Sequence, residues 1–336
     1  MFDLATFLAT RASRGRLLAR HPGEHAIEVR EHDGLRWFTA GGNFVQGLMD
    51  VARPATLVLP HHQAMLAALA WAPRAARLLN LGFGCGCFER FLHAHLESAS
   101  IVSVDCEPAL VDLARAHFAV PAAWPVTIDR AEHFVATATD VYDIVLCDIF
   151  SGEDHADCLF DSYFYADLAA RLGNDGVLAL NVSPHDDDEV VAILAALRQS
   201  IDWVMLAAVA AHGNAVVLAS PAPPPAAEVM TARAAALAPA WDLAPAAVLP
   251  PFERLPGRQE IWGARHDADY DADYDDDYDD DYDEDDCGDG DCDEDDSDDD
   301  VRDNDRERDD ERAGEARTAR DTLPCGPTTA GRSSGR

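Results

Sequence analysis

Two hydrophobic patterns follow each other along the chain. Near the N-terminus, apolar and polar residues alternate over Ile27–Glu31 and Leu35–Thr39, which predicts two β-strands. Asp33-Gly34 lies between them, and this pair tolerates the positive backbone angles of a tight turn, so the strands should form a hairpin. We therefore expect residues 1–72 to be an N-terminal segment that contains a small β-hairpin unit.

After Pro73 the pattern changes, because short apolar runs of strand length alternate with stretches that have helical spacing. Such alternation is typical of parallel strands joined by crossover helices. We expect strands at Arg77–Gly82, Ile101–Asp105, Val126–Asp129, Tyr142–Ile149 and Gly176–Ser183, and helices at Glu89–Leu96, Ala109–Phe118, Phe160–Leu172 and Glu189–Ser200.

The last two expected strands are Trp203–Ala210 and Ala215–Ser220. Their connection is too short for a crossover helix, so they should pair antiparallel. A dinucleotide-binding sheet is all parallel, whereas the sheet of class I methyltransferases ends in an antiparallel hairpin. We therefore predict an α/β fold with a Rossmann-like class I methyltransferase sheet, mostly parallel, in a nucleoside-binding domain over residues 73–220.

The C-terminal part has a different composition. Residues 221–265 are rich in proline and alanine, which indicates a peripheral extension, either a cover or a linker. Residues 266–336 contain 31 acidic residues and 8 arginines, a net charge of −23 out of −36 for the whole chain. Such a segment repels itself and has little to bury, so we predict a disordered acidic tail. It would be a solubilising appendage or would bind basic proteins or cations weakly.

Composition excludes several classes of function. All 26 basic residues are arginines, which excludes a lysine-containing phosphate loop and a Schiff-base mechanism, and the acidic balance disfavours nucleic acid. The sequence has no run of about 18 to 20 apolar residues and no signal-peptide core at its start, so we expect no membrane contact. We expect a cytoplasmic protein with reduced cysteines.

The strongest motif is Leu78–Gly86, a strand that runs into a turn containing Gly82, Gly84 and Gly86. Glycines there let backbone amides approach a ligand at a helix N-terminus, so we predict that they bind a cofactor. Cys87 stands where the third glycine of a dinucleotide fingerprint is required, which disfavours NAD. The alternative is a purely structural turn.

Acidic residues follow two of the expected strands. Asp105 and Glu107 stand where a carboxylate would lie beside the glycine turn and accept hydrogen bonds from ribose hydroxyls. Asp148 stands at the carboxyl end of the expected strand Tyr142–Ile149, at the edge where open α/β sheets place their ligands, and could orient or deprotonate an attacking amine or hold a cation. The alternatives are a helix cap for Asp105 and a structural turn for Asp148.

Histidines and cysteines offer weaker signals. His61 and His62 are adjacent and His93 and His95 alternate on expected helices, so we expect both pairs on the surface and no metal site. Cys85-x-Cys87 has no second cysteine pair and is expected to contribute only small residues to the loop.

Taken in order, these motifs resemble the spermidine synthase family of polyamine aminopropyltransferases. The resemblance covers about residues 25–220 and includes the N-terminal β unit, which plain methyltransferases lack. It rests on Leu79–Gly86, Val104–Pro108, Asp148–Gly152, Leu159–Leu172 and Asp175–Asn181. It implies that the small-molecule substrate is S-adenosylmethionine, its decarboxylated form or methylthioadenosine, with no metal, and that the chain forms a homodimer.

The resemblance also implies roles for single residues. Asp105 would bind the ribose, Gln46 would lie near the nucleoside, and Asp148 would help to activate the attacking amine. Arg130 stands at the position of the acid that contacts adenine, and its neighbour Asp129 could substitute.

Two further departures from the family pattern concern the recognition of amines. The glycine turn has Cys85 where the family carries an aspartate that recognises the cofactor's amine, and Ser151 replaces a second catalytic carboxylate. A polyamine needs carboxylates to replace its hydration, so these losses argue against efficient spermidine synthesis. The leading hypothesis is a transferase that moves an aminopropyl group to a polyamine. The alternatives are a methyltransferase of unknown acceptor and a non-catalytic scaffold of the same fold.

Overall fold

The computed structural model describes residues 7, 15–42, 44–96, 98–209 and 213–257. The predicted disordered tail, residues 266–336, lies outside the described residues. Within the described part, no helix is long and apolar enough to cross a membrane.

The N-terminal unit is an antiparallel sheet of four strands in sequence order: β1 (Arg16–His21), β2 (Ile27–His32), β3 (Leu35–Ala40) and β4 (Gly47–Asp50). The predicted hairpin is β2–β3, and Gly34 takes a φ of 78° in its turn. Trp37 and Leu48 are fully buried and form a small core of their own with Phe7.

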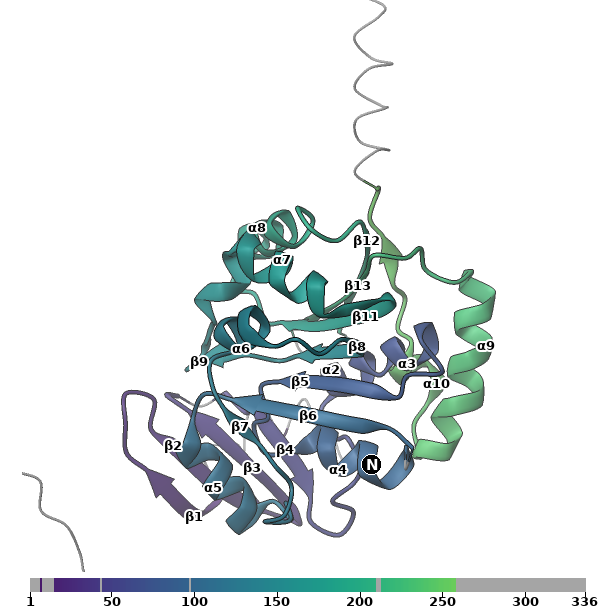
Figure 1. The fold of residues 1–336 in the computed structure, drawn as a ribbon. Helices are drawn as coiled ribbons and strands as arrows, with labels where there is room; N and C mark the ends of the chain where they lie inside the picture. The colour runs from purple at the N-terminus through teal and green to yellow at the C-terminus, as the bar shows by residue number, and fades with distance from the viewer. Residues whose placement is uncertain (1–6, 8–14, 43, 97, 210–212, 258–336) are drawn as a thin grey trace, which may run out of the picture. The chain divides into compact units, whose positions relative to one another are not determined.

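The large sheet has eight strands in the order β14-β12-β13-β11-β8-β5-β6-β7 (Figure 1). Its strands are β5 (Arg77–Leu81), β6 (Ser100–Asp105), β7 (Thr127–Ile128), β8 (Tyr142–Cys147), β11 (Leu172–Val182), β12 (Trp203–Ala208), β13 (Ala215–Ser220) and β14 (Glu253–Arg254). The five neighbouring strands β7, β6, β5, β8 and β11 pair parallel, and β13 pairs antiparallel with both β11 and β12. The predicted fold class is therefore confirmed.

Helices cover both faces of this sheet (Figure 1). The sheet has one hydrophobic core on each face. Successive residues of β8 alternate between them, since Ile144 and Leu146 belong to one core and Val145 and Cys147 belong to the other. One face packs against α6 (Ala131–Thr137), α7 (Ser162–Arg171) and α8 (Asp187–Leu197), and the other against α2 (Pro60–Met65), α3 (Ala67–Trp71) and α4 (Cys87–His95).

Side chains that accept hydrogen bonds from free backbone amides mark where two of the helices begin. Glu107 accepts a hydrogen bond from Ala109 N and begins α5 (Pro108–His117), and Asp186 accepts one from Glu189 N and begins α8. The sequence analysis expects His61 and His62 on a helix but gives no range for α2, α3 or α6. Residues on every side of α2 and α3 are buried or half-buried, so this segment has no amphipathic period to detect.

The chain after β13 returns to the face that carries α3. It forms α9 (Ala227–Leu237), η2 (Ala238–Trp241) and α10 (Pro245–Val248) before β14 joins the edge of the sheet beside β12. Met230 and Trp241 are buried in the same core as Phe91 of α4. This extension therefore covers part of the large sheet.

Candidate functional site

The glycine turn and Asp148 lie against each other. Gly82, Gly84 and Gly86 have positive φ angles of 92°, 54° and 70°. A Cβ on Gly82 would stand 2.0 Å from the carbonyl oxygen of Asp148, so this approach requires glycine. Asp148 N donates a hydrogen bond to Leu81 O at 2.9 Å, because β8 and β5 are adjacent parallel strands.

Asp105 lies on the other side of the turn. Its Oδ2 accepts a hydrogen bond from Gly84 N and its Oδ1 accepts one from Glu107 N, both at 2.9 Å. Burial raises the pKa of Asp105 to about 6, although the backbone hydrogen bonds from Glu107 and Gly84 oppose this rise. The structure thus brings Asp105 to the turn, as predicted, and uses Glu107 as the cap of α5.

Asp129 lies beside the backbone of Asp105. Its backbone N–H donates to Asp105 O at 3.1 Å, and its carboxylate contacts His133 Nδ1 at 2.8 Å. Arg130 is exposed and pairs with Glu132. Asp129 directly follows β7, and its backbone therefore lies next to Asp105.

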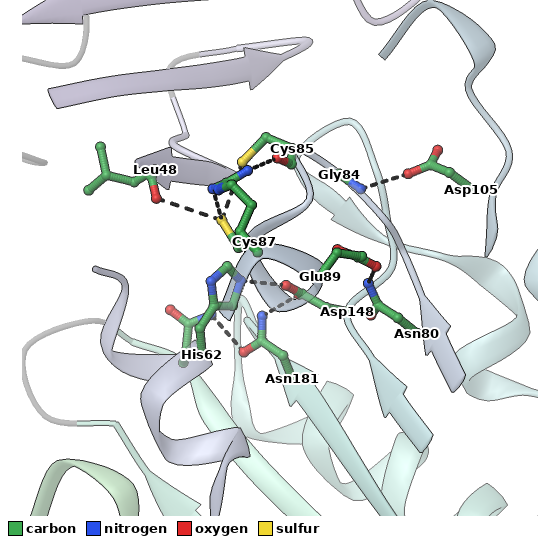
Figure 2. Close-up of polar contacts among 12 residues, drawn as sticks. Leu48, His62, Asn80, Gly84, Cys85, Cys87, Glu89, Asp105, Asp148 and Asn181 are labelled. Atoms are coloured by element: carbon green, nitrogen blue, oxygen red, sulfur yellow. Dashed lines mark hydrogen bonds and ion pairs between the residues drawn. The ribbon is translucent and has the colours of Figure 1, made fainter. Parts of the chain in front are cut away.

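Asp148 is part of a buried polar group (Figure 2). His62 Nε2 donates to its Oδ2 at 2.9 Å, and Asn181 Nδ2 donates to its Oδ1 at 2.8 Å. Burial alone would lower the pKa of His62, but the Asp148 carboxylate and the Cys87 thiol raise it to about 9. Burial opposes ionisation of Asp148 as well, and the imidazolium of His62 keeps the pKa of Asp148 below its usual value. The pair is an imidazolium and a carboxylate at neutral pH.

The predicted surface position of His61 and His62 is wrong. Each is only 3% exposed, because α2 packs against the large sheet and α10. Donor atoms of His61, His62 and Asp148 lie within 4.8 Å of one another, contrary to the expectation that adjacent histidines do not converge. Their place inside the apolar run Leu57–Trp71 is the sequence signal that could have revealed their burial. His93 and His95 are exposed, as predicted.

Cys85 and Cys87 are buried against the N-terminal sheet, and their sulfur atoms are 3.3 Å apart. Cys87 Sγ also contacts Arg90 Nη2 at 3.6 Å and the ring of His62. The hydrogen bond from Cys85, together with His62 and Arg90, lowers the pKa of the Cys87 thiol. Cys85 faces Gly47 of β4, since a Cβ on Gly47 would meet its sulfur at 2.6 Å.

Gln46 connects the N-terminal sheet to the loop after Asp148. This loop forms a small hairpin of β9 (Phe150–Ser151) and β10 (Asp154–His155). Gln46 Nε2 donates to Gly152 O, and Phe44 N donates to Glu153 Oε1 at 2.9 Å. Ser151 is exposed, with its Oγ 3.5 Å from His25 Nε2. Gln46 therefore reaches the site through the hairpin and not through the glycine turn.

Comparison with known proteins decides the family. No protein-family profile matches the chain. It is 30% identical over 197 residues to the polyamine aminopropyltransferase of Chromobacterium violaceum, a match that covers 57% of this chain and 75% of that relative. The chain belongs to the polyamine aminopropyltransferase family. The family's enzymes from Neisseria meningitidis serogroups A and B are 26% identical over 216 residues, covering 60% of this chain and 82% of each relative.

Solved structures agree with the fold. A protein described as a probable spermidine synthase from Corynebacterium glutamicum has a TM-score of 0.59 and 17% identity, covering 74% of this chain and 92% of its own. Human methyltransferase-like protein 13, solved with SAH, has a TM-score of 0.51 and 21% identity, covering 56% of this chain and 94% of its own. These likenesses concern the fold alone, and the similarity to aminopropyltransferases is what suggests a transferase.

Proposed function

We propose that this chain is a transferase that binds an S-adenosylmethionine-type nucleoside over Gly82–Gly86 and Asp105. The observation that carries this proposal is the Asp105 carboxylate, held against Gly84 N at the carboxyl end of β6, with Asp148 beside the same turn. Carboxyl ends of parallel strands are where open α/β sheets bind nucleosides. A polyamine aminopropyltransferase, a methyltransferase-like protein solved with SAH and a spermidine synthase solved with the transition-state analogue AdoDATO are among the proteins similar to this chain.

The nucleoside would be held by complementary groups. Asp105 would accept hydrogen bonds from the ribose hydroxyls, and Asp129 beside it would face the adenine. The turn Gly82–Gly86 leads directly into α4, whose N-terminal amides favour an electron-rich ligand. The sulfonium would then lie towards Asp148, which the backbone of Gly82 touches.

The chemistry is displacement at a carbon next to the sulfonium. The positive sulfur makes the thioether a good leaving group, so the protein mainly has to align an unprotonated acceptor. Family membership favours an aminopropyl group and a polyamine acceptor near Asp148. Asp148 would hold the amine of the acceptor by its charge and orient its lone pair.

Methyl transfer to another acceptor is the second candidate, and two observations favour it. Asp148 is already neutralised by His62, so the pair attracts a polycation less than a free carboxylate would. Cys85 replaces an acid in the turn and faces β4. Both features weaken recognition of amines, whereas neither opposes a cofactor that keeps its carboxylate.

Calorimetry with S-adenosylmethionine, decarboxylated S-adenosylmethionine and methylthioadenosine tests the proposal. We expect at least one to bind more tightly than about millimolar, and Asp105→Asn to weaken that binding by about tenfold or more, since it loses a charge-assisted hydrogen bond. Asp112→Asn is the matched control, because Asp112 is an exposed acid of α5. Preference for the decarboxylated nucleoside supports aminopropyl transfer, and preference for S-adenosylmethionine supports methyl transfer. If none binds, the chain is a scaffold and the proposal is wrong.

A further inference from the structure

Three potential metal ligands converge in the described part of the chain. His61 and His62 are consecutive in α2, and Asp148 comes directly after β8. Each residue offers one donor atom, and these atoms lie within 4.8 Å of one another. Both histidines are 3% exposed, and the Asp148 side chain is 12% exposed. The group is therefore a buried, mixed nitrogen and oxygen donor set.

The donor atoms are close to the spacing that a single ion requires. A metal about 2.0 to 2.2 Å from each ligand keeps neighbouring ligand atoms roughly 3 to 4 Å apart. His62 Nε2 and Asp148 Oδ2 are 2.9 Å apart, which is already near the lower limit. The rings of His61 and His62 are nearly perpendicular, at 80°, with their centroids 4.5 Å apart. Small side-chain rotations would therefore place all three donors around one ion.

Further hydrogen bonds orient the carboxylate. Asn181 Nδ2 donates to Asp148 Oδ1 at 2.8 Å, and Asn214 Nδ2 donates to Asn181 Oδ1 at 3.1 Å. Both asparagines are buried, at 1% and 3% exposure. This chain of bonds leaves Oδ2 for the histidines, as outer hydrogen bonds do for the ligands of known metal sites.

The second ring nitrogen of His62 is a separate observation. His62 Nδ1 is buried and has no well-aligned hydrogen-bond partner among the described residues, and the Cys87 thiol lies close enough to interact with the ring. The ring therefore has Asp148 at Nε2 and the Cys87 sulfur as a second neighbour. If Nε2 binds a metal, the Cys87 sulfur can accept the Nδ1 proton, which would fix the ring for ligation.

We propose that His61, His62 and Asp148 bind one divalent first-row transition metal ion of the Zn²⁺ class. Two imidazoles and one carboxylate suit zinc or ferrous iron, and they suit magnesium or calcium poorly. Three protein ligands leave at least one coordination position for a further ligand. The site lies beside Gly82, but the proposal does not depend on nucleoside binding.

Metal binding is best measured in the full chain, with the tail cysteines Cys287, Cys292 and Cys325 replaced by serine so that they cannot bind the probe. After removal of bound metal, the protein is dialysed against Zn²⁺ and, separately, titrated with Co²⁺. We expect about one ion per chain more than in the His61→Gln/His62→Gln variant, because each ligand removed weakens a three-ligand site strongly. Bound cobalt should show the visible absorption of a nitrogen and oxygen site.

The matched control is His93→Gln/His95→Gln, which removes two exposed histidines of α4 and should bind as much metal as the parent. Tail carboxylates contribute equally to every variant, so the difference reports the site. Asp148→Asn, with folding checked by circular dichroism, should lose the same ion and protects the test against misfolding of the histidine variant. Equal binding by the parent and by folded Asp148→Asn would overturn the proposal. So would an intense thiolate-to-cobalt band that Cys87→Ser removes.

Discussion

At the scale of single residues, the environment decides what each acid of the site can do. Asp105 and Asp148 both follow parallel strands and are both buried, yet their pKa values move in opposite directions. Asp105 accepts hydrogen bonds from the backbone amides of Gly84 and Glu107 and forms no ion pair with a described residue, so burial dominates its pKa. Asp148 has the imidazolium of His62, so charge dominates. One is suited to neutral hydroxyl donors, and the other is suited to a cation.

This difference predicts a pH dependence for nucleoside binding. Since the pKa of Asp105 is raised to about 6, the carboxylate gains a proton as the pH falls through this value and becomes a weaker acceptor. If only the ionised form binds ribose, affinity should fall about tenfold from about pH 7 to about pH 5. Calorimetry across this range measures the effect. Asp105→Asn should bind weakly with a flat profile, and an equal slope in both proteins would contradict the assignment.

Gly82 offers a second test at this scale. Gly82→Ala combines a φ of 92° with a Cβ only 2.0 Å from the Asp148 carbonyl oxygen. We expect it to lower the free energy of unfolding by about 3 kcal/mol or more, because strain and a backbone clash add. Gly34→Ala is the control, since its φ is 78° and its Cβ would meet nothing within 4 Å. It should cost only about 1 kcal/mol in chemical denaturation. An equal loss of unfolding free energy in Gly82→Ala and Gly34→Ala would show that the turn can move away from Asp148.

At the scale of elements, short segments from the N-terminal sheet hold the site together. The β9–β10 hairpin follows Asp148 directly and is tied to the N-terminal sheet by Gln46 and Phe44. The hairpin is also anchored on its other side by the buried His155, which accepts a hydrogen bond from Ser183 N at 2.9 Å. The bonds from Gln46 and Phe44 therefore hold the side that faces the N-terminal sheet. The sequence pattern predicts strands and helices of ordinary length well, but two-residue strands have no period to detect.

Gln46→Ala should therefore loosen the hairpin without unfolding the protein. The loss of one hydrogen bond is worth about 1 kcal/mol, so amide exchange over residues 150–155 should accelerate roughly fivefold, as followed by mass spectrometry. Gln63→Ala is the control, because Gln63 also bonds a backbone oxygen, Leu57 O at 2.7 Å, but belongs to α2. The same acceleration in both variants would refute a specific role for Gln46.

At the scale of the whole molecule, the C-terminal extension should contribute to the stability of the fold, whereas the acidic tail should not. The extension returns to the large sheet and buries Met230 and Trp241, and the Trp241 ring packs edge-on against Phe91 with centroids 5.3 Å apart. The tail carries −23 of the net charge of −36. Net charge affects solubility and association rather than the fold, so mutations can distinguish the effects of the two segments on stability.

Removal of residues 266–336 should leave the free energy of unfolding and nucleoside affinity unchanged. Trp241→Ala should cost about 3 to 5 kcal/mol, because it opens a cavity in the core. Val229→Ala, on the exposed side of α9, should cost less than about 0.5 kcal/mol. Thermal and chemical denaturation of the three proteins measure these differences. A large loss of stability without the tail would show that it packs on the core.

The sequence by itself determined the main alternation of strands and helices from β5 to β13, without α6 and the β9–β10 hairpin, the antiparallel end of the sheet, and the approach of Asp105 to the glycine turn. These features follow from local periodicity and from the geometry of parallel strands, whose carboxyl ends meet at one edge. It also located Asp148 at that edge.

Only the tertiary structure decided what surrounds Asp148. The apolar run Leu57–Trp71 hints that His61 and His62 are buried, but only the fold shows that α2 lies against the large sheet and α10 and that both histidines reach Asp148. The contact of Gln46 with Gly152 joins residues 106 positions apart. Hydrophobic periodicity reports which side of an element is buried, but not which partner buries it, so the partners of a buried polar group emerge only from the folded chain.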